Sequence, residues 1–198
     1  MKTQFAVLAA LSLGAFAQPA AAQSVSTSTY KKVLEFAGCV VDANGDGARA
    51  VLATVPGSFE AATAISRLVA GSTCGDRKDK PEVMRGAIAE RIYLIVYPDK
   101  PAEVTGTPAP FVGSGDPKLG NYDVTRCAAQ RDPVGADMLV RSELRSDAEK
   151  AAVKRIIPVI GACTPAGAQI GFDREKMRGL IAEGLIAVRG TQPAPVGQ

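Results

Sequence analysis

The chain has 198 residues, with 23 lysines and arginines, 20 aspartates and glutamates and no histidine, so its formal net charge is +3. The basic residues are scattered rather than clustered, which argues against nucleic acid and anionic membrane surfaces as partners. The lack of histidine excludes a Ser-His-Asp or Cys-His catalytic arrangement and removes the commonest general base and metal ligand.

The first 22 residues have the pattern of a secretory signal peptide. A single basic residue, Lys2, precedes an apolar run from Phe5 to Phe16, and three small residues, Ala20 to Ala22, provide a cleavage site. The apolar run is too short to span a bilayer, and no later segment is apolar enough, so no integral membrane segment is predicted. We expect residues 1–22 to be removed and the mature chain, starting near Gln23, to be periplasmic or secreted.

Residues 30–97 are predicted to form a first helical unit, because their apolar residues recur at the spacing of an amphipathic helix. The middle helix should begin at Ser58, after the Pro56-Gly57 turn, and bury Phe59. The segments KVLEFAGCVV and IYLIVY are also rich enough in β-branched residues to form strands, but helix is favoured throughout. The expected helices lie near residues 33–40, 49–54, 58–69 and 81–95.

Residues 98–121, PDKPAEVTGTPAPFVGSGDPKLGN, are dense in proline and glycine and nearly free of periodic apolar residues. This composition predicts a long connection between two units. The connection is either a tether, which we favour, or a binding loop that presents Phe111. The tail, residues 191–198, is predicted to be disordered.

Residues 122–190 repeat the pattern of the first unit. The middle helix of this second unit should begin at Ser146, and Pro158 should kink or end it. The last helix should have Asp173 as its N-cap and stop at Gly190.

Two stretches of the chain share the motif M-R-G-x-I-A-E: residues 83–95 read VMRGAIAERIYLI and residues 176–188 read KMRGLIAEGLIAV. A pair of cysteines precedes each stretch, and the two pairs have nearly equal separations. We therefore predict an all-α fold of two tandem disulfide-bridged helical repeats, packed as one pseudo-symmetric domain or as two small ones. The loop-closure model assigns each bridge about 4 kcal/mol. The predicted bridges join Cys39 to Cys74 and Cys127 to Cys163.

The segment PGSFEAATAISRL, followed by a cysteine and then by MRGAIAERIY, resembles uncharacterised small exported proteins of alphaproteobacteria, of the sphingomonad type. The likeness spans most of both units. The second unit departs from it at SELRSDAEKAAV, where the Pro-Gly turn is absent. The resemblance supports the repeat and implies no activity, cofactor or binding residue.

The repeated motif supplies two charged residues in each unit, Arg85 with Glu90 and Arg178 with Glu183. The two glutamates are the natural candidates for a general acid and base, with the arginines holding an anion beside them. Residues five apart lie about 140° apart around a helix axis, however, so Arg85 and Glu90 do not share a face.

A structural interpretation fits this motif better than catalysis. Gly86 and Gly179, each followed by an alanine three residues later, give the two helices a small-residue patch where they can approach closely. If the units pack about a pseudo-twofold axis there, the arginine of each motif meets the glutamate of the other. The expected contacts are Arg85 with Glu183 and Arg178 with Glu90.

Asp42, Asn44 and Asp46 match the first half of an EF-hand calcium loop. The second half fails, because alanines occupy the ninth and twelfth positions, Ala50 and Ala53, where further ligands belong. These three residues are weak calcium candidates, and a helix-connecting turn is the favoured interpretation. No metal or other cofactor is expected.

The sequence favours one class of function and leaves two alternatives. The favoured one is a non-catalytic periplasmic interaction or structural protein, whose partner is a periplasmic protein or a small ligand. The alternatives are an enzyme that uses the duplicated glutamates and a carrier of a small ligand or lipid.

Overall fold

The computed structural model describes residues 26–168, 170–171 and 173–190, and the regular secondary structure within them is helical. None of these helices is long and apolar enough to cross a membrane. The predicted signal peptide, residues 1–22, and the predicted disordered tail, residues 191–198, lie outside the described residues. The elements are α1 (Thr27–Ala43), α2 (Gly45–Ala53), α3 (Phe59–Ala70), α4 (Pro81–Val96), the 3-10 helix η1 (Pro117–Leu119), α5 (Gly120–Arg131), α6 (Pro133–Arg141), α7 (Asp147–Cys163) and α8 (Arg174–Gly190).

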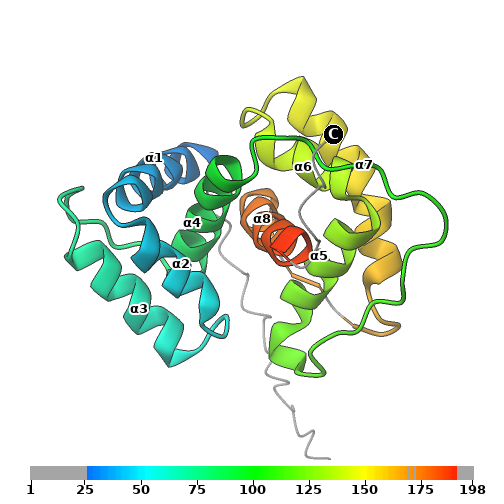
Figure 1. The fold of residues 1–198 in the computed structure, drawn as a ribbon, viewed down its shortest axis with the longest axis horizontal. Helices are drawn as coiled ribbons and strands as arrows, with labels where there is room; N and C mark the ends of the chain where they lie inside the picture. Colours follow the sequence, from blue (N-terminus) through cyan, green and yellow to red (C-terminus); the bar gives the residue numbers. More distant parts are fainter. Residues whose placement is uncertain (1–25, 169, 172, 191–198) are drawn as a thin grey trace, which may run out of the picture.

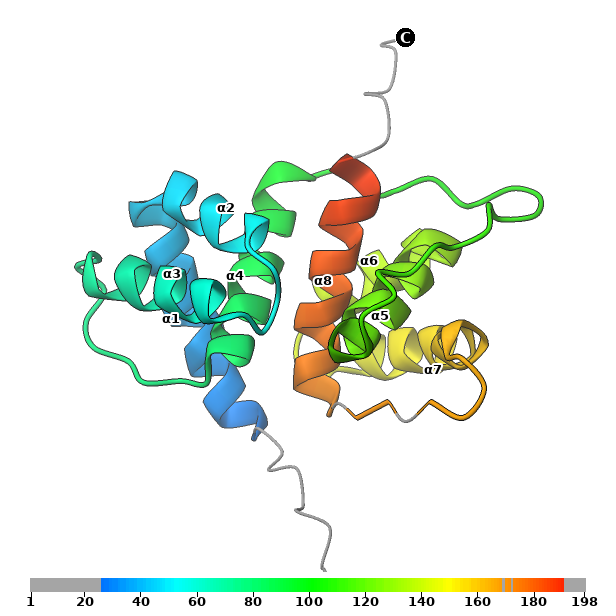
Figure 2. The same ribbon diagram turned by 90° about the horizontal axis from the view of Figure 1, so that it is seen from below.

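The helices form two groups that meet at α4 and α8 (Figures 1 and 2). The N-terminal half (α1–α4) encloses one hydrophobic cluster, which includes Val33, Val40, Ile65 and Ile88. The C-terminal half (α5–α8) encloses a second, which includes Val124, Leu139, Ile156 and Ile181. Ala89 and Tyr93 of α4 belong to the second cluster, so the two halves share buried residues.

Helix starts follow the capping signals in the sequence. The Ser58 side chain accepts a hydrogen bond from Ala61 N, and the Ser146 side chain accepts one from Glu149 N, so these serines are N-caps and both predicted helix starts are confirmed. The two segments with strand-like composition are helical, in α1 and α4. Pro158 does not end its helix, since α7 continues to Cys163.

The expected burial of Phe59 is wrong, because its side chain is 88% exposed. The buried face of α3 is formed by Ala61, Ile65 and Leu68. Phe59 precedes Ala61 by two positions, which places it about 200° away around the helix axis. The face of α3 that packs against the neighbouring helices is therefore the face of Ala61, and it does not include Phe59 despite its hydrophobic side chain.

Both predicted disulfides are present. Cys39 of α1 is bonded to Cys74, in the segment after α3, and Cys127 of α5 is bonded to Cys163, the last residue of α7. Each bond therefore lies within one half. The two Cα–Cα distances are both 5.9 Å.

The connection between the halves runs along the outside of the C-terminal half (Figure 2). Arg126 of α5 donates to Val112 O at 2.9 Å, and its guanidinium lies 5.0 Å from the centre of the Phe111 ring. Asp123 of α5 accepts hydrogen bonds from the backbone and side chain of Ser114. The segment is thus attached to α5, and the end of the predicted linker, residues 117–121, is already helical.

Candidate functional site at the contact between the halves

Helices α4 and α8 touch through their backbones at Gly86 and Gly179. A Cβ atom on Gly86 would lie 3.0 Å from the Gly179 Cα, and a Cβ atom on Gly179 would lie 2.5 Å from the Gly86 Cα. Real Cβ atoms essentially never come within 2.5 Å of a heavy atom in another part of the chain, and a separation of 3.0 Å is tighter than almost all Cβ contacts. The absence of a side chain at both positions is therefore what allows this contact.

Arg85 of α4 pairs with Glu183 of α8 across the contact. Its Nη2 lies 2.5 Å from Glu183 Oε1, and the Arg85 side chain is only 2% exposed. The same guanidinium donates to Val51 O at 2.7 Å and to Leu52 O at 3.0 Å. These carbonyls belong to the last turn of α2, so Arg85 also caps that helix where its dipole favours a cation.

Arg178 of α8 makes the reciprocal set of contacts. Its Nη2 lies 3.1 Å from Glu90 Oε2 of α4, and both side chains are 3% exposed. The guanidinium also donates to Leu139 O at 2.8 Å and to Val140 O at 3.0 Å, in the last turn of α6. The six residues selected from the repeated motif, Arg85, Gly86, Glu90, Arg178, Gly179 and Glu183, thus lie at one contact between the halves.

The surroundings of the two ion pairs differ. Arg178 has a second carboxylate partner, because Glu149 Oε1 of α7 lies 3.1 Å from its Nη1 and the Glu149 side chain is fully buried. The Arg85–Glu183 pair instead borders a hollow of about 200 Å³. Burial and the nearby Glu183 carboxylate raise the pKa of Tyr122, which also lines this hollow, to about 12.

Sequence reasoning missed Glu149, although a signal for it was present. Ser146 and Glu149 form the S-x-x-E pattern of a capping box, in which the glutamate normally bonds back to the N-cap backbone. Here Glu149 Oε2 accepts from Arg145 N at 2.8 Å, and Oε1 is left for Arg178. The pattern indicates a helix start but not this second partner.

Glu90 is an almost completely buried acid of the site. Burial raises its pKa above the ordinary value of 4.5, although Arg178 and the hydroxyl donor Tyr30 act in the opposite direction. Burial and the Glu90 carboxylate also raise the pKa of Tyr30 well above 10.0. Burial alone would lower the pKa of Arg178, but Glu90 holds it above its ordinary value. The buried surroundings therefore oppose ionisation of Glu90 and Tyr30, while the Glu90 carboxylate keeps Arg178 charged.

The raised pKa of Glu90 predicts a pH-dependent difference between the wild type and Glu90→Gln. A group whose pKa is higher in the folded state stabilises the fold below its unfolded pKa, and this stabilisation is lost as the pH rises through the folded pKa. The stability of Glu90→Gln relative to wild type should therefore increase from pH 4 to pH 8, by about 1.4 kcal/mol for each pH unit between the two pKa values. Urea unfolding across this range measures it. A difference that stays flat or decreases would contradict the assignment.

The three weak calcium candidates are engaged by other groups. Asn44 Oδ1 accepts from Gly47 N at 2.8 Å and so caps α2. Asp42 pairs with Arg91 at 3.0 Å, and Asp46 pairs with Arg49 at 2.7 Å. The structure therefore uses this stretch as the turn between α1 and α2. Across the described residues, no cluster of three or more acidic, histidine or cysteine side chains is placed to hold a metal ion.

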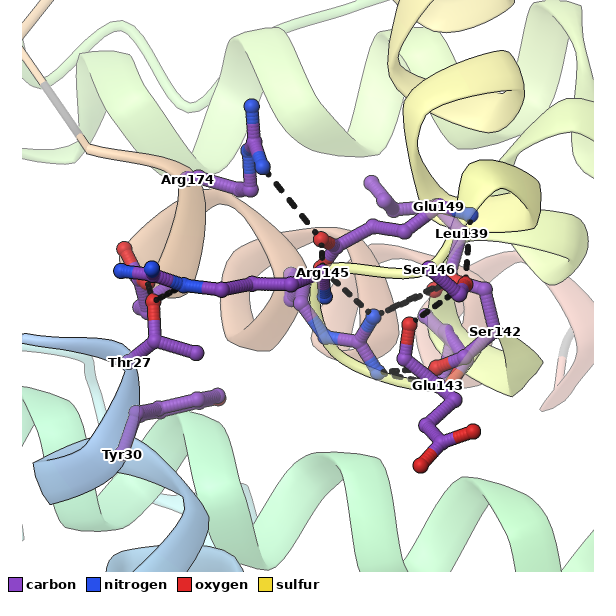
Figure 3. Close-up of polar contacts among 12 residues, drawn as sticks. Thr27, Tyr30, Leu139, Ser142, Glu143, Arg145, Ser146, Glu149 and Arg174 are labelled. Carbon is purple, nitrogen blue, oxygen red and sulfur yellow. Dashed lines mark hydrogen bonds and ion pairs between the residues drawn. The ribbon is translucent and has the colours of Figure 1, made fainter.

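A polar pocket lies beside the buried site, where the first turns of α1, α7 and α8 meet. It has a volume of about 580 Å³. We call it the junction pocket, and its lining residues are Thr27, Arg145, Lys150, Arg174 and Glu175. Figure 3 shows Arg145 extending toward Thr27, while Arg174 reaches toward Glu149. The Arg145 Nε donates to Thr27 Oγ1 at 2.8 Å and so connects the two halves.

A larger cleft of about 980 Å³ lies on the C-terminal half. It is lined by the attached segment around Phe111, by α5 and by the residues that follow α7. The disulfide residues Cys127 and Cys163 also line it, together with the apolar side chains of Val124 and Ile170. This cleft is larger than the junction pocket.

Comparisons with protein-family models, with curated proteins and with solved structures find no match to this chain.

Proposed function

We propose that this protein is a non-catalytic binding or structural protein of the periplasm or the extracellular space, built from two copies of one helical unit. The repeated motif, the order of four helices in each half and the one disulfide within each half support the duplication. The reciprocal arginine contacts support a pseudo-twofold relation between the copies. In this proposal, α4 and α8 are equivalent helices that join the copies.

One observation carries the non-catalytic part of the proposal: the two duplicated glutamates are already occupied. Glu90 is 2% exposed and is bonded to Arg178 and Tyr30. Glu183 is bonded through both carboxylate oxygens to Arg85. A general acid or base must come within hydrogen-bond reach of a substrate, and these carboxylates are instead used to hold the halves together.

A carrier of a small ligand is the second candidate function. The cleft of about 980 Å³ on the C-terminal half favours it, because this volume is in the upper range for small-molecule sites. The mixture of apolar and polar lining residues, such as Val124, Ile170, Asp123 and Arg131, suits a ligand with both characters.

The experiment that tests this proposal separates binding from turnover. The mature, disulfide-bonded protein is incubated with a periplasmic metabolite extract, and both the protein-bound fraction and the remaining extract are measured by mass spectrometry. We expect any depleted metabolite to be lost in an amount no larger than that of the protein and to be released unchanged on denaturation. Depletion far beyond the amount of protein, abolished in a folded Glu183→Gln variant, would instead establish an enzyme.

A further inference from the structure

The junction pocket is rich in basic side chains. Arg145, Lys150 and Arg174 line it, and Lys31 lines an adjoining hollow of about 440 Å³ that shares Thr27 and Arg145 with it. The side chains of Lys150 and Arg174 are 63% and 42% exposed, so both are open to solvent. The charged groups of Lys150 and Arg174 are therefore accessible from the junction pocket and are not buried in the core.

Acidic groups at the pocket are fewer or are engaged elsewhere. The two lining carboxylates are Glu143 and Glu175, and Glu175 is mostly buried and accepts from Thr27 Oγ1 at 2.6 Å. Asp147 is exposed and pairs with Lys150, while the buried Glu149 pairs with both Arg178 and Arg174. Counted over the junction pocket and the adjoining hollow together, the lining has four cations and two carboxylates, so the lining residues carry a net positive charge. Lys150 and Arg174 are each paired with a further carboxylate that does not line either space.

Arg145 is held in an unusual backbone conformation. Its φ is +63°, and it is the only residue other than glycine with a positive φ in the described part of the chain. The turn before α3 has a glycine in the same place, Gly57, with a φ of +73°. A left-handed conformation is strained for arginine and unstrained for glycine. Strained backbone conformations of this kind occur mostly at functional sites, so the strain at this exposed position points to a role for the Arg145 side chain.

The Arg145 side chain is anchored but keeps donors available. Among the described residues, its side-chain hydrogen bonds are confined to Nε, which donates to Thr27 Oγ1. The N–H groups of its Nη1 and Nη2 therefore remain for a ligand, and an anchored guanidinium loses less freedom on binding one. The amino-terminal ends of α1, α7 and α8 contribute additional positive potential in the same region.

We propose that the junction pocket binds a small ligand that carries an oxyanion group, a phosphate or a carboxylate, with Arg145, Lys150 and Arg174 as its charged contacts. This inference rests on the proposed function, because it names the chemistry of a ligand for a non-catalytic binding protein. A pocket of about 580 Å³ accommodates such a group together with a small organic part.

The test measures the stabilisation of the mature protein by two anions. Urea unfolding midpoints are recorded with inorganic phosphate, with succinate and with sodium chloride at equal ionic strength, because a ligand that binds only the folded state raises the midpoint. We expect phosphate or succinate, but not chloride, to raise the midpoint of the wild type. The more effective anion shows whether the ligand group is a phosphate or a carboxylate.

Arg145→Gly is the informative variant, because glycine relieves the backbone strain while the guanidinium is lost. We expect it to fold with a midpoint close to that of the wild type and to bind the effective anion about tenfold more weakly. The matched pair Lys31→Gln and Lys32→Gln adds a control, since Lys31 lines the adjoining hollow and Lys32, its exposed neighbour, does not. Lys32→Gln should respond as the wild type does.

Two results overturn the inference: no anion-specific stabilisation of the wild type, or equal stabilisation of the wild type and Arg145→Gly. Neither affects the proposed function, because the large cleft on the C-terminal half remains available for a ligand. Release of inorganic phosphate from glycerol phosphate by the wild type, lost in Arg145→Gly, would instead support the anion site and overturn the non-catalytic proposal. Failure of the anion site and failure of the non-catalytic proposal therefore give different experimental results.

Discussion

Replacing Gly179 with alanine is expected to lower the free energy of unfolding by about 3 kcal/mol. The added Cβ would lie 2.5 Å from the Gly86 Cα and 3.0 Å from the Gly86 carbonyl carbon, and backbone atoms cannot rotate away as a side chain can. Relief therefore requires α4 and α8 to move apart, which lengthens the ion pairs on both sides of the contact. Urea unfolding with the disulfides intact measures the change.

The control for this prediction is the same substitution at Gly161. This glycine is exposed near the end of α7, and a Cβ there meets no atom within 4 Å. Alanine is the better helix former, so Gly161→Ala should stabilise the protein by up to about 1 kcal/mol. If the two variants changed stability equally, the close backbone contact at Gly179 would not be a determinant of stability.

Replacing Arg178 with methionine should destabilise the protein by about 4 kcal/mol. Methionine fills much of the space of the arginine stem but supplies no charge. Glu90 and Glu149 would then be left as neighbouring buried carboxylates, and the carbonyl groups at the end of α6 would lose their donor. The cost comes from uncompensated burial more than from the lost attraction itself.

Two comparisons test this explanation of the Arg178 effect. Arg85→Met should be milder, because its partner Glu183 is 17% exposed and hydration can compensate its charge. Adding Glu90→Gln to Arg178→Met should recover part of the lost stability, because one of the two stranded charges is removed. Equal losses in the two arginine variants, with no recovery in the double variant, would show that packing of the side-chain stem dominates.

Local features of the structure could be predicted well from the sequence. The caps at Ser58 and Ser146 depend on residues three positions apart, and the two disulfides follow from cysteine spacing within a repeated pattern. The repeated motif also predicts that each arginine pairs with the opposite glutamate, and both pairs are present. This pairing required only that two similar glycine-containing helices face one another.

Features that depend on how separate helices pack could not be predicted in the same way. Phe59 has the hydrophobicity of a core residue, yet the position of α3 against its neighbours leaves it exposed. Glu149 carries the signal of a helix start, yet the approach of α8 to α7 turns it into a partner of Arg178. The exposure of Phe59 and the pairing of Glu149 with Arg178 both depend on how separate helices are placed. The periodicity of apolar residues within one helix does not specify that placement.

The sequence by itself determined the helical class, the helix starts at Ser58 and Ser146 and the bridges, because each depends on short-range spacing or on a covalent pair. The first two helices begin earlier than expected, at Thr27 and Gly45. Only the tertiary structure decided which charges are buried together and where a pocket opens. The junction pocket exists because the first turns of α1, α7 and α8, which are far apart along the chain, meet beside the α4–α8 contact. The close approach of α4 and α8 at Gly86 and Gly179 is likewise a property of the packed molecule and not of any one segment.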